Sequence, residues 1–443
     1  MTETILRRVL LILVMTIFCG VVFHAPMSVW LGTILPDHQQ IIKAWKELLI
    51  VMAVVVAMLQ VGRHHLWRQL WCDWVIRLSL AYIAVHVMTV AIMPQGLLPT
   101  IAGLMIDLRF VLFFVVVYTA LRLYPWWRRP LLTGGLVAAF LSLCFVLLQV
   151  TVLPHDALKH IGYDKDTTIA PYMTVDQNYD YVRVNGTLRG PNPLGAYAII
   201  VLAVGLSALT VAMPKLRKIR HFLPWVLGVV VVLSVVALWF SYSRSAVVVG
   251  IAAIGCVVGL ALWRYSSRLA LIAGGVAVVV GVSVIIGQWN SSLIQNILLH
   301  RNAESSSMVG SNEEHAASLE EGWRRMVAQP FGAGVGSTGS ASLLGDQSII
   351  IENQYLFIAH EIGWLGMGLF GWLYGVLLVR LYQRRDDYLA FGVLISGIGL
   401  ALIGLLLPVW ADDTVSLVWW GLAAVAIASR GHKKERKSDA RSS

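Results

Sequence analysis

Four arginines lie next to apolar segments of the chain, where a permanent charge needs a partner. They are Arg183 and Arg189 in RVNGTLRGPNPLGAY, Arg244 in SYSRSA and Arg324 in GWRRMVAQPFGAGVGS. The guanidinium group is planar and always charged, and it bonds two phosphate oxygens at once. We therefore expect these arginines, above all Arg189 and Arg244, to bind a pyrophosphate group. The competing interpretation is that each side chain extends to lipid headgroups.

Three residues are candidates for a general base, the group that takes a proton from an attacking hydroxyl. Glu352 opens the segment ENQYLFIAHEIGWLG, His360 lies about two turns further along the same predicted helix, and His315 lies in a long polar segment. Each also has an interpretation without catalysis. Glu352 would suit the positive N-terminal end of a helix, His360 would form a buried hydrogen-bonded pair with Glu361, and His315 would be solvated.

Other polar residues in apolar surroundings are candidates to border a cavity, because ionisable groups inside a membrane are costly and often functional. They are Asp107, Arg109, Asn353 and Glu361. Asp107 and Arg109 are two residues apart near the end of one predicted helix. They also have the simpler interpretation of a structural ion pair.

The sequence predicts no metal site and no cofactor. Its four cysteines lie in or beside apolar segments without CxxC spacing, which is typical of small core residues. The polar segments contain no metal-ligand spacing and no DxD-like motif for a nucleotide sugar. The glycine-rich stretch from Gly332 to Gly339 lacks the lysine of a P-loop.

The composition predicts a membrane protein. The chain has 443 residues, of which 58% are hydrophobic and 13% are charged, whereas soluble domains carry about 25% charged residues. Apolar runs of about 18 residues or more suffice to cross a bilayer. We predict apolar helices near residues 9–30, 46–62, 76–94, 104–121, 131–152, 192–212, 224–240, 246–262, 269–287, 354–379, 388–408 and 414–429.

The connections between these helices differ in charge. Lys and Arg cluster at 63–68, 122–129, 215–220, 264–268, 380–385 and in the C-terminal RGHKKERK, whereas the short connections 95–103 and 409–413 are poor in them. The positive-inside rule places the basic set in the cytoplasm. The net charge of +10 is thus explained by topology, and we expect no nucleic-acid partner.

The predicted architecture is an all-α polytopic protein of the cytoplasmic membrane, with about 12 spans and both termini in the cytoplasm. Residues 1–432 form one transmembrane domain, and 433–443 form a basic tail. Long outside loops, 153–191 and 288–353, precede the sixth and tenth helices. In the second loop Leu319, Trp323 and Val327 share a helical face, which predicts an amphipathic helix on the membrane surface or over a cavity.

Four motifs in series resemble the O-antigen ligase / O-antigen polymerase superfamily of bacterial envelope proteins. They are TLRGPNPLGAY, SYSRSA, GWRRMVAQPFGAGVGS and ENQYLFIAHEIGWLG. Their order and spacing agree with that family, as does the long outside loop before the tenth helix. The resemblance covers mainly residues 180–405, and the N-terminal helices match in kind but not in motif.

This resemblance implies a metal-independent membrane glycosyltransferase without a cofactor. Its donor would be a glycan on undecaprenyl pyrophosphate at the outer leaflet, and its acceptor a glycan or lipid hydroxyl. Arg189 and Arg244 would contact the pyrophosphate, with Arg183 and Arg324 as weaker candidates. Their fixed charge would stabilise negative charge on the leaving group.

Ligase members of the family commonly carry a His-Asn pair where this chain has Glu352 and Asn353. Glu352, His315 or His360 would then act as the base, or the acceptor would be activated in another way. This departure favours a polymerase that joins lipid-linked repeat units. The alternatives are a ligase that transfers finished glycan and a polysaccharide transporter or flippase. Transporters usually place polar sites at mid-depth, whereas the unusual residues here cluster at one predicted face.

Overall fold

The structure is a computed structural model that describes residues 3–175, 178–212, 222–265, 308–346 and 348–428. In these ranges the regular elements are helices and one two-stranded sheet. The predicted all-α class is therefore confirmed, with the small sheet as an addition. The predicted helix at 269–287 and the tail 433–443 lie outside the described residues.

The elements from the N-terminus to residue 161 are helices that are joined by short connections. They are α1 (Glu3–Gly20), η1 (Val21–Phe23), α2 (His24–Ile34), η2 (Pro36–His38), α3 (Gln39–Lys43), α4 (Trp45–Arg63), α5 (Trp67–Trp71), α6 (Trp74–Ile92), α7 (Leu97–Leu123), η3 (Pro125–Trp127), α8 (Arg128–Thr151) and η4 (Ala157–Ile161).

The remaining elements begin with the sheet. They are β1 (Met173–Val175), β2 (Asn178–Arg183), α9 (Pro191–Ser207), the π-helical η5 (Ala208–Ala212), α11 (Leu223–Phe240), α12 (Arg244–Tyr265), α14 (Met308–Ala328), α15 (Gly339–Ser342), α16 (Gln354–Gln383), α17 (Tyr388–Ile403), η7 (Val409–Ala411) and α18 (Asp413–Ala428).

Many of these helices are suited to a membrane. Within the described ranges, eight are long and apolar enough to cross one. They are Glu3–Ile34, Trp45–Arg63, Trp74–Ile92, Leu97–Leu123, Pro125–Thr151, Pro191–Thr210, Leu223–Phe240 and Gln354–Gln383. Shorter apolar helices at Arg244–Leu260, Tyr388–Ile403 and Asp413–Ala428 coincide with three further predicted spans. The chain therefore has the helices of a multi-pass membrane protein, and the count of 12 stays a prediction.

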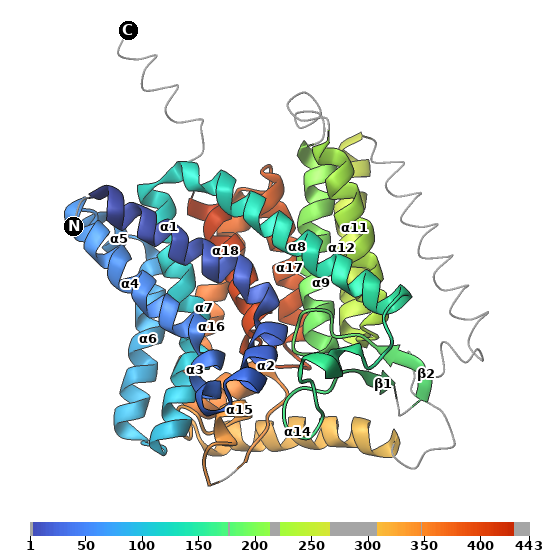
Figure 1. Ribbon diagram of the computed structural model, residues 1–443. Helices are drawn as coiled ribbons and strands as arrows, with labels where there is room; N and C mark the ends of the chain where they lie inside the picture. The colour runs from blue at the N-terminus through green and yellow to red at the C-terminus, as the bar shows by residue number, and fades with distance from the viewer. Residues whose placement is uncertain (1–2, 176–177, 213–221, 266–307, 347, 429–443) are drawn as a thin grey trace.

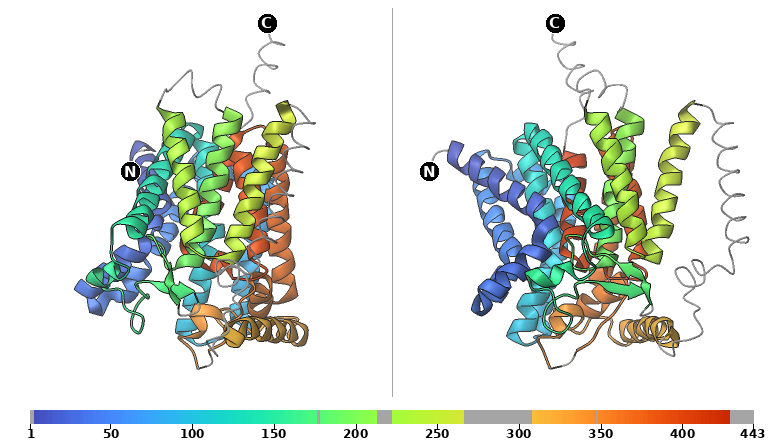
Figure 2. Two further views of the ribbon diagram at one scale, coloured as in Figure 1. Left: turned by 90° about the vertical axis from the view of Figure 1, so that its right-hand side faces the viewer. Right: turned by 45° about the vertical axis from the view of Figure 1, so that its right-hand side comes forward.

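The helix bundle has two ends of different character (Figures 1 and 2). The sheet and α14 lie at one end, which we call the loop end. The N-terminus and the end of α18 lie toward the opposite end, which we call the terminal end. Both predicted long loops thus have their described parts at the same end of the molecule.

The centre of the bundle is an aromatic cluster around α18, which packs along α7 (Figure 1). Trp410, Trp419 and Trp420 are fully buried. The ring centre of Trp420 lies 5.0 Å from that of Phe110 on α7. Because lipid tails are as apolar as these side chains, such packing stabilises the bundle mainly through van der Waals contacts.

The α16 helix is interrupted at Ile362 and Gly363. Gly363 has a φ of +71°, which is outside the helical range. The shorter piece before this break carries Asn353 at its N-cap and includes His360 and Glu361, and the longer piece runs on to Gln383. The break frees backbone groups that need other partners, and the second long loop supplies them.

Candidate functional site: charged residues at the loop end

Arg183 joins three elements at the loop end. It ends β2, and its Nε donates to the carbonyl of Ser241 (2.9 Å) in the turn between α11 and α12. Its Nη2 donates to Oδ1 of Asn192 (2.7 Å) in the first turn of α9. Val184 reinforces the contact, because its backbone N–H donates to the carbonyl of Phe240 (3.2 Å). Arg183 therefore fixes the positions at which α9 and α12 begin.

Arg189 and Arg244 lie at the starts of two neighbouring helices. Arg189 immediately precedes Gly190, the N-cap of α9, and Arg244 is the first residue of α12. The two helices pack closely, since a Cβ on Gly195 would lie 2.7 Å from the Cβ of Ala246. The side chain of Arg189 is exposed and that of Arg244 is half-buried. Among the described residues, neither has a hydrogen bond or ion pair to another side chain.

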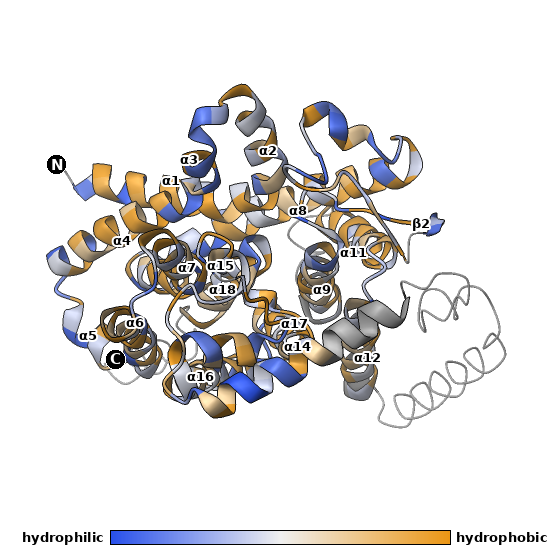
Figure 3. Cartoon of the chain, turned by 90° about the horizontal axis from the view of Figure 1, so that it is seen from below, coloured by the Kyte–Doolittle hydropathy of each residue, from blue (hydrophilic) through white to orange (hydrophobic). Residues whose placement is uncertain are grey.

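This arrangement favours an anionic ligand. The N-terminus of a helix carries a partial positive charge and unpaired backbone N–H groups. Two such termini with two arginines lie at the end of the bundle that carries both loops (Figures 1 and 3). A phosphate there would meet charge from both sources.

A buried network of charged residues also lies toward the loop end. Asp413, the first residue of α18, accepts from Nζ of Lys46 (3.1 Å) and lies 3.2 Å from Nε2 of His24. Lys46 also lies 3.2 Å from Glu47, which in turn pairs with Nη1 of Arg109 at 3.2 Å. All five side chains are buried, and the network links α2, α4, α7 and α18.

Both ring nitrogens of His24 have partners in this network. The indole Nε1 of Trp45 donates to Nδ1 of His24 (2.9 Å), and an indole N–H is a donor only. Nδ1 therefore accepts this hydrogen bond, and Nε2 lies between Nζ of Lys46 (3.1 Å) and Oδ2 of Asp413 (3.2 Å). His24 thus contacts both charged groups of the network through one ring nitrogen.

Arg189 lies at the edge of this network. Its charge acts on Asp412 and Asp413 and on His24. Burial and the neighbouring charge of Asp413 raise the pKa of Asp412 above that of an ordinary aspartate. The Oδ1 of Asp412 accepts from the N–H of Val415 (2.9 Å). The neighbouring carboxyl groups of Asp412 and Asp413 therefore produce a negative electrostatic potential beside the exposed guanidinium group of Arg189.

Asp107 and Arg109 do not pair, contrary to the simpler interpretation of their spacing. Arg109 reaches Glu47 and the carbonyl of Ala411. Asp107 faces the other way, with Oδ2 at 3.9 Å from Nε2 of His86, and it interacts with Glu361. Residues two apart on a helix point in nearly opposite directions, so the two side chains join different networks.

The glycine-rich stretch fills the break in α16. The N–H groups of Ala333 and Gly334 donate to the carbonyls of His360 (2.6 Å) and Glu361 (3.1 Å). Trp364 N–H donates back to the carbonyl of Pro330 (2.9 Å). The stretch is held on its other side by α7, where a Cβ on Gly336 would lie 2.1 Å from the carbonyl oxygen of Pro99. The loop is therefore inserted between α7 and α16, and glycine is required by space as well as by φ.

Glu361 and His360 do not form the hydrogen-bonded pair that we considered. Glu361 Oε1 accepts from the N–H groups of Gly336 (3.1 Å) and Thr338 (3.4 Å). His360 is fully buried, and neither of its ring nitrogens has a hydrogen-bond partner among the described residues. Neighbouring residues on a helix diverge in direction, which separates these two side chains.

Asn353, not Glu352, caps the N-terminus of α16. Its Oδ1 accepts from the N–H groups of Tyr355 (2.9 Å) and Leu356 (3.0 Å), and its Nδ2 donates to the carbonyl of Leu405 (2.8 Å). An Asx side chain at the N-cap has the short reach that this geometry needs. Glu352 is half-buried beside it. Its carboxylate is therefore not used for capping.

The amphipathic helix expected around residue 323 is α14, and it lies across the loop end (Figure 3). Leu319, Trp323 and Val327 are about half exposed, while the opposite face packs on α16.

Arg324 is bound to Glu321, and this hydrogen bond lowers the pKa of the Glu321 carboxyl. Arg324 is thus already engaged, unlike Arg189 and Arg244. His315 lies on α14, and its side chain is outside the described part of the chain.

Several charged residues of this region were not predicted from the sequence. They are His24, Lys46, Glu47, Asp412 and Asp413. The signal that could have indicated them is the pairing of ionisable residues, KE and DD, at the ends of apolar segments, where such groups are costly. In the described residues, no group of three or more His, Cys, Asp or Glu side chains is placed to hold a metal ion.

A comparison of the chain with models of protein families and with curated proteins finds no match.

Proposed function

We propose that the chain is a polymerase that joins undecaprenyl-pyrophosphate-linked oligosaccharide repeat units at the outer face of the cytoplasmic membrane. It would span that membrane about 12 times as one domain, with both termini in the cytoplasm and the loop end outside. Its partners would be the lipid-linked glycan donor, a glycan acceptor and membrane lipids.

One observation carries the proposal: Arg189 and Arg244 lie at the starts of adjacent helices at the loop end, and within the described structure neither forms an ion pair with a carboxylate. Both guanidinium groups are therefore available to an anionic ligand. A lipid pyrophosphate, which lies at the membrane surface, has the charge and the position for this role.

The proposed reaction is a glycosyl transfer beside Arg189 and Arg244. The hydroxyl oxygen of the acceptor attacks the anomeric carbon of the donor, and the bond from that carbon to the pyrophosphate oxygen breaks. Undecaprenyl pyrophosphate leaves with the bonding electrons, and the arginines stabilise its added charge. The hydroxyl proton passes to a base. Glu352 is the favoured base because it is half-buried at the loop end, whereas the ring of His360 is enclosed.

A transporter is the second candidate function, and one observation favours it. Transporters often have broken helices with charged residues near the break, and α16 is broken beside Glu361 and Asp107. The polymerase is preferred because the backbone of the glycine-rich stretch already satisfies the freed carbonyls of the break. A ligase would use the same arginines with a different acceptor.

The test is the surface-glycan ladder of cells that lack the gene, complemented with variants. Arg244→Ala and Arg189→Ala are expected to lower chain extension by about a hundredfold or more, since losing a group that stabilises transition-state charge has that magnitude. Arg244→Lys keeps the positive charge but loses the planar guanidinium group that bonds two oxygens at once. This variant should therefore retain part of the chain extension that Arg244→Ala loses. Lys159→Ala is the matched control, because Lys159 is an exposed cation near the loop end that pairs with Asp156.

The ladder separates the three candidates. Single repeat units on the final acceptor support the polymerase. Full-length chains that remain on the lipid carrier indicate a ligase, and repeat units trapped on the cytoplasmic side indicate a transporter. A full ladder with both arginine variants would overturn the proposed site.

A further inference from the structure

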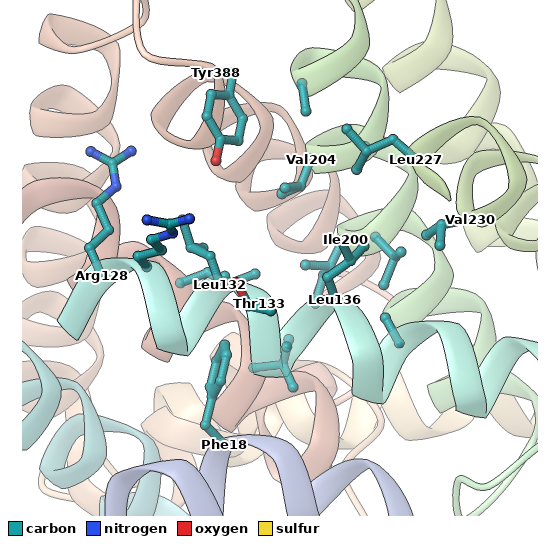
Figure 4. A pocket seen from close by; sticks show the side chains of 18 of the residues that line it. Phe18, Arg128, Leu132, Thr133, Leu136, Ile200, Val204, Leu227, Val230 and Tyr388 are labelled. Atoms are coloured by element: carbon teal, nitrogen blue, oxygen red, sulfur yellow. The ribbon is translucent and has the colours of Figure 1, made fainter. Parts of the chain in front are cut away.

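A cavity lies between helices of the bundle, away from the loop end. This cavity of about 790 Å³ lies between α1, α8, α9, α11, α17 and α18 and opens to the surface of the bundle. Its volume is within the range of sites for small molecules, about 300–1,000 Å³. Its walls are mostly apolar, and Phe18, Leu136, Ile200, Val204 and Val230 are among the residues that line it (Figure 4).

The charged lining residues are confined to one part of the cavity. Arg128 and Arg129 begin α8, and Asp387 precedes α17. Figure 4 shows Arg128 and Tyr388 at the same side of the cavity, with Phe18 far from them. Trp126 is 61% exposed and Arg129 is exposed, so the cavity reaches the surface of the bundle here. The apolar walls extend away from this charged rim.

The charges of the rim leave one cation without a carboxylate. Nη2 of Arg128 lies 2.6 Å from Oδ2 of Asp387, and Asp387 also caps α17 by accepting from the N–H of Leu389 (2.9 Å). Arg129 has no ion pair or hydrogen bond within the described residues. Among the described residues of the rim, Arg129 is therefore a cation without a carboxylate partner, and it lies beside an exposed tryptophan, a residue type favoured at the membrane interface.

We propose that this cavity binds an anionic phospholipid of the bilayer, with one acyl chain between α8 and α9 and its phosphodiester at Arg129. A phosphodiester carries a negative charge, which complements the unpaired charge of Arg129. Arginine bonds phosphate oxygens bidentately. The lining of the cavity does not include Arg189 or Arg244, so this site is distinct from the proposed glycan site and does not depend on it.

The test is native mass spectrometry of the protein purified in mild detergent, stripped of lipid and titrated with phosphatidylglycerol or phosphatidylcholine of the same acyl chains. Phosphatidylglycerol is expected to bind more tightly, and Arg129→Ala should weaken its binding by roughly tenfold, the effect of losing a charged hydrogen bond. Leu136→Trp, which narrows the cavity at its wall, should weaken the binding of both lipids at this site.

Matched controls keep the test specific. Arg68→Ala removes an exposed arginine of α5, and Leu141→Trp enlarges a side chain of α8 that is 52% exposed and outside the lining. Both should bind phosphatidylglycerol like the wild type. Equal binding of the two phospholipids, or unchanged binding by Arg129→Ala and Leu136→Trp, would overturn the proposal. Tighter binding of undecaprenyl phosphate than of phosphatidylglycerol would also overturn it, because the occupant would then be the carrier lipid.

Discussion

At the scale of single residues, charge is balanced by partners from distant parts of the chain. Lys46 and Arg109 are buried, and each has a carboxylate within 3.2 Å, Asp413 or Glu47. A buried pair contributes little net stability, because desolvation offsets attraction, but removing one partner leaves an unpaired buried charge. Asp413 meets both Lys46 and His24, so its loss leaves the buried Lys46 with one carboxylate fewer.

We therefore expect Asp413→Asn to destabilise the protein strongly, by about 3–5 kcal/mol. Lys46→Met should also destabilise it, and the double variant should lose less than the sum of the two, since neither charge is then left alone. The measurement is thermal unfolding of the purified protein in detergent. Asp37→Asn, an exposed aspartate in η2, is the control. Additive effects, or single variants as stable as this control, would contradict the network.

At the scale of elements, the break in α16 and the glycine-rich stretch form one interlocked unit. Gly336 has a φ of +85° and approaches Pro99 on α7, while Gly332 has a φ of +89° and approaches the carbonyl of Glu361. The glycine-rich stretch is therefore joined to the bundle through backbone hydrogen bonds in addition to buried apolar side chains such as that of Val335. Such contacts tolerate no Cβ, which explains the glycines.

Gly336→Ala is expected to destabilise the protein by at least about 1–3 kcal/mol, the cost of holding a non-glycine residue in a sparsely populated backbone region. The clash with Pro99 adds to this cost. The matched control is Gly368→Ala in the longer piece of α16, where a Cβ would meet no atom within 4 Å. That variant should be neutral or more stable by up to about 1 kcal/mol, because alanine favours a helix. Equal melting temperatures for the two variants would contradict the close packing of the glycine-rich stretch against α7.

At the scale of the whole molecule, the two ends of the bundle differ in what they present. The loop end carries α14, whose exposed Leu319, Trp323 and Val327 suit the membrane interface. The terminal end carries Cys72, which is exposed in the turn between α5 and α6. These positions allow the proposed orientation to be tested without any assay of activity.

In a variant that keeps Cys72 and replaces the other three cysteines with serine, a membrane-impermeant maleimide should label Cys72 only after the membrane is opened. Asp37→Cys in a cysteine-free background should be labelled in intact spheroplasts, because Asp37 is exposed toward the opposite end. The reason is the positive-inside rule, which places the basic connections in the cytoplasm. Labelling of Cys72 in intact spheroplasts would reverse the proposed orientation.

The sequence by itself determined the class of protein and the identity of its helices. Hydrophobicity is a local property of the chain, so apolar runs alone predicted the long helices and the amphipathic face of α14. Local chemistry also indicated that Arg189 and Arg244 were unusual, because both border apolar segments. Each of these predictions needs only neighbouring residues.

Only the tertiary structure decided which charges meet. Asp413 and Lys46 are separated by most of the chain, yet they lie 3.1 Å apart, and nothing local links them. The divergence of Asp107 from Arg109, the break at Gly363 and the cavity beside Arg129 are likewise set by how helices pack against one another. Packing depends on contacts between distant segments, and these are not encoded in the periodicity or charge of any single one.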